Sequence, residues 1–443
     1  MAEWHVTEDL FGRFLSSAVS REEAQRIIRH LVSPCQPCSE LASRMTSEVG
    51  RSSQQRQAYE AVFARALAFA SQQEERLALE KLRGWAQWAS LESSPPPARL
   101  ARVEADERYH THGFYERLLE ASRWYIRTDP NEAVDVIRLA IRVAEHLDTA
   151  AIGAEHVADL RAAAWAALGN AERLASSFEA ARRAFDEAWR ILEEEGTNDP
   201  VERAHLIGLE SGYTQDMGEF EAAEAALEEA LDIYHKLGDT HLHGRTLLKM
   251  GDCIGQIDPE RGIARILQAL PLLAGAKEPR LDLCAQHDLA WFLNDNGQSE
   301  EALAILDRAR PIYRQFPDSW TQLRLHWLEG RIAVNLGDLS AGESIFGQLW
   351  EELRVRDLHH ELVLVSIDLA EVLVRKGEPN RAAALVEQCV PILQAWGLHR
   401  YALAAWLAFQ EALEQGWVLG VFDRMREYYR RHWVKPAVFE PEG

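Results

Sequence analysis

The chain has 443 residues, of which 47% are apolar, so it is long enough to bury a substantial core. It carries 70 acidic against 48 basic side chains, a formal net charge of −22. A large nucleic-acid interface needs a basic face, so this balance argues against nucleic acid as a partner. Residues 1–50 hold 5 basic and 7 acidic groups, so almost all of the excess negative charge lies on the rest of the chain and favours basic partners.

Signals for export, membrane insertion and disulfide formation are not found in the sequence. Met1–Leu15 contains acidic residues and no continuous apolar run, unlike a signal peptide. No stretch reaches the roughly 18 uncharged apolar residues of a membrane span. The five cysteines are sparse and odd in number, which does not suggest a disulfide framework. We therefore expect a cytoplasmic protein, and the Ala-, Arg-, Glu- and Leu-rich composition is typical of bacterial chains.

The first 50 residues differ in pattern from the rest and predict a small helical head. Thr7 followed by Asp9–Leu15 predicts a short capped helix. Ser20 and Glu23 have the S-x-x-E spacing of a capping box, which predicts a second helix running to about Leu31.

Four possible metal ligands accompany these helices. In Cys35-Gln-Pro-Cys38 a C-x2-C turn lets two thiolates face one ion, while His30 and His5 can supply the third and fourth ligands. This arrangement resembles the zinc-binding anti-sigma-factor domain of bacteria, in which an upstream Cys or His and an H-x3-C-x2-C motif hold one zinc. The resemblance covers residues 5–45 and implies a Zn²⁺ bound by His5, His30, Cys35 and Cys38. The spacing His30-x4-Cys35 is one residue longer than in that family.

Two other interpretations of the C-x2-C motif remain open. The cysteines could be reduced residues of a small cap, or a redox pair, although no βαβ pattern surrounds them. A head this small can bury only a modest core, which favours zinc because the metal would supply folding free energy. Four protein ligands leave no position for a reactive water, so we expect such a zinc to be structural.

Residues 51–112 form a predicted bridge between the head and the remainder. Gln55–Leu91 has the apolar spacing of one long helix or two joined helices. Trp85 and Trp88, three residues apart, are expected to face a core together. Ser93-Ser-Pro-Pro-Pro97 should end this helix, with Pro95–Pro97 as a stiff spacer at a domain boundary.

A regular pattern occupies residues 113–415. Small residues, or their replacements, recur seven apart at Ala133/Ala140, Ala181/Ala188, Ala223/Ala230, Gly262/Ala269, Ala302/Ala309, Gly342/Leu349 and Ala382/Cys389. The first members of these pairs are separated by 48, 42, 39, 40, 40 and 40 residues. This period predicts an all-α solenoid of about seven helix-turn-helix units of ~40 residues, in which small residues let helices approach closely. Turns are expected at Asp129-Pro130, Asp199-Pro200, Asp258-Pro259, Gly297, Gly337 and Gly377.

The unit Trp165–Leu192 resembles a tetratricopeptide (TPR) repeat, with W-x2-LG followed by A-x3-F-x2-A. The resemblance implies a right-handed solenoid in which the first helix of each unit lines a groove that binds a protein or peptide. By register, the groove-facing residues are Asn170, Arg173, Gln215, Asp252, His287, Trp291, Trp327, Arg331 and Glu371. The Lys/Asn set with which chaperone-binding members clamp a C-terminal carboxylate is not reproduced, since only Asn170 falls at a matching position.

Trp291, Trp327 and Arg331 are the first candidates for partner binding, as an exposed patch within the groove. Trp and Arg dominate the hot spots of protein interfaces. For each groove residue taken alone, a solvated or packing role is favoured over partner binding.

Residues 416–443 should cap the solenoid, with a helix from Val421 to about Trp433 that pairs with a preceding helix from Tyr401 to about Gln415. From Arg424 to Lys435 the chain carries five basic residues against one acid, interleaved with aromatic residues. Such a cluster can contact nucleic acid. We expect instead that the aromatics pack on the last repeat and that the arginines pair with the acidic solenoid.

Catalytic motifs are not found: the sequence has no G-x4-G-K-[ST], H-E-x-x-H or G-x-S-x-G. We therefore expect a non-enzymatic scaffold or regulator that binds a protein or peptide. By the family resemblance, the head would hold a sigma factor or similar partner while the solenoid receives the signal. The alternative is an adaptor or regulatory subunit of an effector enzyme, such as a protease, in which the zinc head is only a structural cap.

Overall fold

The computed structural model describes residues 5–15, 18–32, 35–49, 78–275, 277–356, 358–396, 399–416 and 420–439. All regular structure in these ranges is helical, as predicted. None of the described helices is both long enough and apolar enough to cross a membrane. The chain divides into two compact units, Met1–Leu82 and Arg83–Gly443. Much of the predicted helix Gln55–Leu91 lies outside the described residues, which resume at residue 78.

The head contains the three short helices α1 (Glu8–Leu15), α2 (Arg21–Val32) and α3 (Gln36–Val49). The predicted capping box is present: the Glu23 N–H donates to Ser20 Oγ (3.1 Å), and the Ser20 N–H donates to Glu23 Oε2 (2.9 Å). Phe11, Ile27 and Cys38 are buried together in a small core. Both helices predicted for this region are thereby confirmed.

The start of the second unit differs from the predicted bridge. In the helical residues 78–91, Trp88 is buried as predicted, but Trp85 is 52% exposed, with the Arg117 guanidinium 3.5 Å from its ring centroid. Residues three apart on a helix point about 60° away from each other, which is enough to leave Trp85 outside the core. Pro96 and Pro97 do not form a spacer. They begin α5 (Pro96–Ala105), because the first turn of a helix does not require their missing N–H groups.

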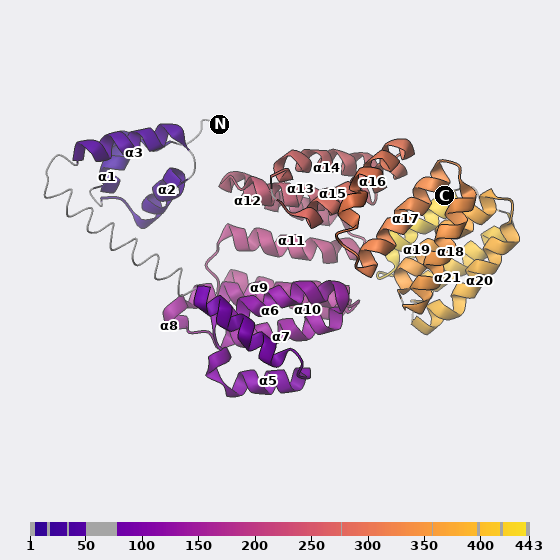
Figure 1. Ribbon diagram of the computed structural model, residues 1–443, viewed down its shortest axis with the longest axis horizontal. Coiled ribbons are helices and arrows are strands. Elements are labelled where there is room, and N and C mark those ends of the chain that lie inside the picture. The colour runs from indigo at the N-terminus through magenta and orange to yellow at the C-terminus, as the bar shows by residue number, and fades with distance from the viewer. Residues whose placement is uncertain are drawn as a thin grey trace. The chain divides into compact units, whose positions relative to one another are not determined.

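Seven antiparallel helix pairs follow α5 and the short turn η1 (Glu107–Tyr109) (Figure 1). They are α6 (His112–Thr128) with α7 (Pro130–Glu145), α9 (Ala154–Leu174) with α10 (Phe178–Glu194), α11 (Pro200–Asp216) with α12 (Phe220–Leu237), α13 (Thr240–Gly255) with α14 (Pro259–Leu273), α15 (Pro279–Asp295) with α16 (Ser299–Tyr313), α17 (Ser319–Asn335) with α18 (Leu339–Val355), and α19 (His359–Arg375) with α20 (Pro379–Trp396). The four-residue α8 (Thr149–Ile152) separates the first two pairs. Helices α21 (Arg400–Glu414) and α22 (Val421–His432) form the predicted capping pair.

Local sequence explains where these helices begin and turn. At the three Asp-Pro doublets the aspartate caps a helix by accepting a backbone hydrogen bond from its first turn, and the proline occupies the first helical position; the helices are α7, α11 and α14. Gly297, Gly337 and Gly377 have φ values of +78°, +93° and +80° in the turns that join the two helices of a pair. A left-handed residue of this kind ends a helix at little cost only when it has no side chain.

The small residues that revealed the repeat are the points where paired helices touch. Ala181, Ala188, Ala223 and Ala230 are all 0% exposed. Between α13 and α14 the backbones approach closely, because a Cβ built on Gly262 would lie 2.5 Å from the Gly255 Cα. The positions at which small residues repeat in the sequence are therefore the positions at which the paired helices pack against each other.

The last helix, α22, is held on its apolar face by α21. Met425 and Tyr429 are fully buried, and the Phe422 ring packs edge-on against Phe409 at 5.5 Å. The Tyr429 hydroxyl donates to the Ala402 carbonyl (2.9 Å). The predicted packing of the C-terminal aromatics on the end of the solenoid is confirmed for these residues.

The side of α22 next to this apolar face is held by charge. Arg426 Nε donates to Asp368 Oδ1 on α19 (2.9 Å), and its guanidinium also pairs with Glu371. Asp368 Oδ2 accepts from the Trp327 indole N–H on α17 (2.8 Å). Burial alone would raise the pKa of Asp368, but Arg426 and Arg331, together with the Trp327 hydrogen bond, lower this pKa below its usual value. One carboxylate thus joins α17, α19 and α22.

Asp368→Asn should destabilise the C-terminal end of the solenoid by about 3 kcal/mol, because it leaves the buried Arg426 without its main counter-charge. Asp423→Asn is the matched control. Asp423 also accepts from Arg426 (3.0 Å), but its side chain is 87% exposed, so we expect a loss below about 0.5 kcal/mol. Urea unfolding followed by circular dichroism measures both changes. Equal losses in the two variants would contradict the structural role of Asp368.

Candidate functional site

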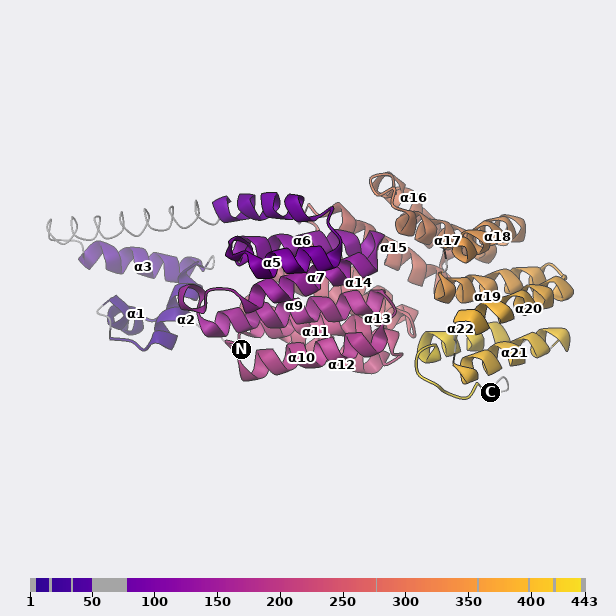
Figure 2. The same ribbon diagram turned by 90° about the horizontal axis from the view of Figure 1, so that it is seen from below.

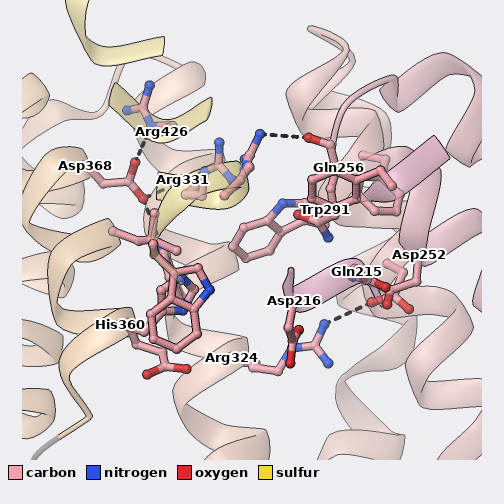
Figure 3. A pocket seen from close by; sticks show the side chains of 18 of the residues that line it. Gln215, Asp216, Asp252, Gln256, Trp291, Arg324, Arg331, His360, Asp368 and Arg426 are labelled. Atoms are coloured by element: carbon pink, nitrogen blue, oxygen red, sulfur yellow. Dashed lines mark hydrogen bonds and ion pairs between the residues drawn. The ribbon is translucent and has the colours of Figure 1, made fainter. Parts of the chain in front are cut away.

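A pocket of about 220 Å³ opens between the first helices of five successive repeats and α22 (Figure 3). Its lining comes from α11, α13, α15, α17, α19 and the C-terminal segment, and includes Gln215, Asp216, Asp252, Asp288, Trp291, Arg324, Trp327, Arg331, His360, Asp368, Arg426, Arg430 and Trp433. Five of the predicted groove residues are among them: Gln215, Asp252, Trp291, Trp327 and Arg331. The helical register therefore located the inner face of the repeats.

Three carboxyl groups form one side of the pocket. Asp216, Asp252 and Asp288 follow one another at intervals of 36 residues, one helical turn less than the 40-residue repeat, so they form a row across α11, α13 and α15. Arg173 pairs with Asp216 (2.7 Å), and Arg324 pairs with Asp288 (3.0 Å). Burial raises the pKa of Asp252, and burial together with the charge of Asp252 raises the pKa of Asp288 to about 7.

Guanidinium groups form the other side. Arg331 pairs with Asp295 (2.9 Å), and Arg430 donates to the Gln256 carbonyl (3.0 Å). Burial lowers the pKa of Arg430, and the positive charge of Arg331 lowers it further. Figure 3 shows Asp216 and Asp252 on one side of the Trp291 indole and Arg331 and the Asp368–Arg426 pair on the other. The pocket therefore presents opposite charges to anything that enters it.

Two indoles lie between the charged sides. The Trp291 and Trp327 rings meet edge to face at 5.5 Å, and the Arg331 guanidinium lies 4.6 Å from the Trp291 ring centroid. Trp291 is partly buried, but Trp327 is only 8% exposed. The prediction of an exposed patch is therefore wrong for Trp327, because its ring belongs to the core around α17 and α19 and its N–H is bound by Asp368.

The other predicted groove residues lie outside this lining. Arg173 is hydrogen-bonded to Asn170 (3.1 Å) as well as to Asp216, so these two side chains support the acidic side from behind. His287 is 3% exposed and shares a hydrogen bond of 2.5 Å with the Tyr313 hydroxyl, and burial lowers its pKa. Glu371 lines an adjoining cavity of about 340 Å³.

Register alone did not identify Asp216, Asp288, Arg324 or His360 as pocket residues. A signal for them exists in the sequence, because they continue the 36-residue row through Asp252. For Arg430 and Trp433 no such signal exists, because the C-terminal segment reaches the pocket from outside the repeat pattern.

The head brings a second set of functional side chains together. One ligand atom from each of His5, His30, Cys35 and Cys38 lies within 4.8 Å of all the others. His5 Nδ1 is 3.3 Å from Cys35 Sγ and 3.5 Å from Cys38 Sγ. A tetrahedral zinc with bonds of about 2.3 Å to sulfur and about 2.0 Å to nitrogen would place those atoms about 3.5 Å apart, which matches the two distances from His5.

The surroundings of Cys38 also suit a metal ligand. The backbone N–H of Val6 donates to Cys38 Sγ (3.3 Å), a contact that favours the thiolate. Burial nevertheless raises the pKa of the Cys38 thiol. A bound cation would offset this penalty, because metal ligation requires the deprotonated sulfur.

The sequence matches the tetratricopeptide repeat family over residues 211–237, which span the end of α11 and all of α12. Two solved structures resemble a larger part of the chain. A Rap protein complexed with Competence and Sporulation Factor is 13% identical, with a TM-score of 0.56, and the match covers 70% of this chain and 85% of that one. NprR in complex with its cognate peptide NprX is also 13% identical, with a TM-score of 0.50 and coverage of 74% and 90%. The chain thus has the fold of a TPR-like helical solenoid.

Proposed function

We propose that this protein is a non-catalytic regulator that binds a peptide, or a short extended segment of a partner protein, in the pocket between α11–α19 and α22. The observation that carries this proposal is the pocket's composition: carboxylates on one side, guanidinium groups on the other and Trp291 between them. A peptide offers backbone donors and acceptors together with charged and apolar side chains, and so matches all three surfaces.

The size of the pocket limits what can enter. At about 220 Å³ it is smaller than the roughly 300–1,000 Å³ of drug-sized ligand sites. A bound peptide would therefore insert one or two side chains and run along the inner helices with the remainder. The two similar solenoids, solved with Competence and Sporulation Factor and with the NprX peptide, are consistent with this use of the fold.

We infer separately that the head binds one structural Zn²⁺ through His5, His30, Cys35 and Cys38. The close grouping of the four ligand atoms and the short His5–cysteine distances support this inference. Because the head is a compact unit of its own, it offers a second partner a surface distinct from the pocket. Its resemblance to anti-sigma domains suggests a sigma factor as that partner; an effector enzyme such as a protease is the alternative.

Trp291→Ala should weaken peptide binding at least tenfold, a loss of about 1.4 kcal/mol, because the indole forms the centre of the pocket. The probe is a fluorescent octapeptide selected from a random library displayed against the full-length chain, and anisotropy gives its Kd. Trp124→Ala is the matched control, since Trp124 is 62% exposed on α6, away from the pocket lining. Selection of no octapeptide above background, or equal Kd values for Trp291→Ala and the parent chain, would refute the proposed site.

Zinc content tests the head. Full-length protein purified without chelators should hold about one zinc per chain by elemental mass spectrometry, and Cys38→Ser should lose most of it. Cys284→Ser is the control, since this cysteine lies in α15 of the solenoid and should leave the content unchanged. A content near zero, or one that Cys38→Ser does not alter, would rule out this site.

A further inference from the structure

The end of α22 and the residues after it contact helices far earlier in the chain. Arg431 pairs with Glu221 on α12 (3.2 Å), and Lys435 pairs with Glu219, which precedes that helix. These partners are 210 and 216 residues apart in sequence. Figure 2 shows α22 at the edge of the C-terminal group of helices that is nearest to α13.

Aromatic and backbone contacts strengthen this crossing. The Trp433 ring lies between His360, at 4.4 Å, and Phe178 at the start of α10, at 5.3 Å. A Cβ built on Gly218, whose φ is +76°, would lie 2.2 Å from the Arg431 carbonyl oxygen. Only glycine leaves room for the two backbones at this point.

The same crossing completes the pocket. Arg430 and Trp433 belong to its lining, and Arg430 also bonds the Gln256 carbonyl at the end of α13 (3.0 Å). We propose that residues 430–435 act as a strap along one edge of the pocket, attached to α12 in this structure, and that its detachment widens the opening through which a peptide enters or leaves. The identity of the ligand rests on the proposed function, but movement of the strap can be measured without that ligand.

The strap can open while the rest of α22 stays in place, because the two segments are held differently. Met425 and Tyr429 of α22 are fully buried, and Arg426 is held by the buried Asp368. In contrast, the Lys435–Glu219 pair joins side chains that are 47% and 49% exposed. Exposed ion pairs of this kind are weak and are screened by salt. Within the strap, Lys435–Glu219 is therefore the contact that breaks most easily, whereas Arg431, whose side chain is 25% exposed, is held more firmly.

Access of a reagent to the pocket tests the strap. A thiol is introduced on the pocket lining by Gln215→Cys in the full chain and is labelled with a maleimide attached to an octapeptide. Reversing the two strap charges, Arg431→Glu with Lys435→Glu, should raise the labelling rate about fivefold to tenfold, because both ion pairs become repulsive. Salt at about 1 M, where the Debye length is about 3 Å, should raise the rate in the parent chain as well. Peptide mapping by mass spectrometry separates this thiol from the native cysteines.

A charge swap separates opening from unfolding. Adding Glu219→Lys and Glu221→Arg to the reversed strap restores the attraction and should return the rate to that of the parent chain. Arg354→Glu, which reverses the charge of an exposed pair with Glu351 on α18, should leave the rate unchanged. The strap proposal would be overturned if the charge reversal left the labelling rate unchanged, or if the charge swap did not return the rate to that of the parent chain. Either result leaves peptide selection and the Trp291→Ala comparison as independent tests of the proposed function.

Discussion

The ion pair between Asp368 and Arg426 is the interaction on which the C-terminal half of this solenoid depends. A stack of helical repeats leaves its last apolar face uncovered unless an atypical unit caps it. Here the cap is α22. Its buried aromatic face packs on α21, and its Arg426 side chain pairs with Asp368 on α19. Because Asp368 also binds the Trp327 indole, the same carboxylate holds one of the pocket's aromatic side chains and the helix that borders the pocket.

The row of polar and charged side chains in the pocket has a shorter period along the sequence than the repeats themselves. The repeats are about 40 residues long, whereas the polar and charged side chains at 216, 252, 288, 324 and 360 recur every 36 residues. Each step moves one turn back along the next helix, so the row crosses the inner face diagonally. Three acids are followed by Arg324 and His360 along this row, and Arg324 pairs with the third acid, Asp288. Local packing requires small side chains at helix crossings and does not demand charges there, so the packing of the repeats does not by itself explain this row.

Much of this arrangement could be predicted from the sequence because it is local. The small residues at Ala181 and Ala188 revealed the repeat, since every helix crossing of the same type needs them. The register then located Gln215, Asp252 and Trp291 on the inner face. The expected pairing of the C-terminal arginines with acidic solenoid residues is also seen, at Asp368 and Glu221.

The rest could not be predicted because it depends on contacts across many repeats. Trp433 meets Phe178 because each helix pair is rotated relative to the one before it and these rotations add up along the solenoid. No local sequence pattern reveals the total rotation. The same reason explains why Trp327 was expected on the surface: its ring packs in a core that the next repeats complete, and its N–H binds Asp368 one repeat later. In the head, the ligand spacing suggested the grouping of His5 with Cys35 and Cys38, but the metal itself stays a prediction.

The claim that the C-terminal segment crosses to α12 can be tested in the unmodified protein with a zero-length carbodiimide. This reagent joins a lysine amine to a carboxylate only when the two are in direct contact, as Lys435 and Glu219 are. Mass spectrometry of the digested monomer should identify a peptide that contains Lys435 joined to one that contains Glu219. If Lys435 is linked only to carboxylates within its own C-terminal segment, the segment does not make this crossing and the strap along the pocket is contradicted.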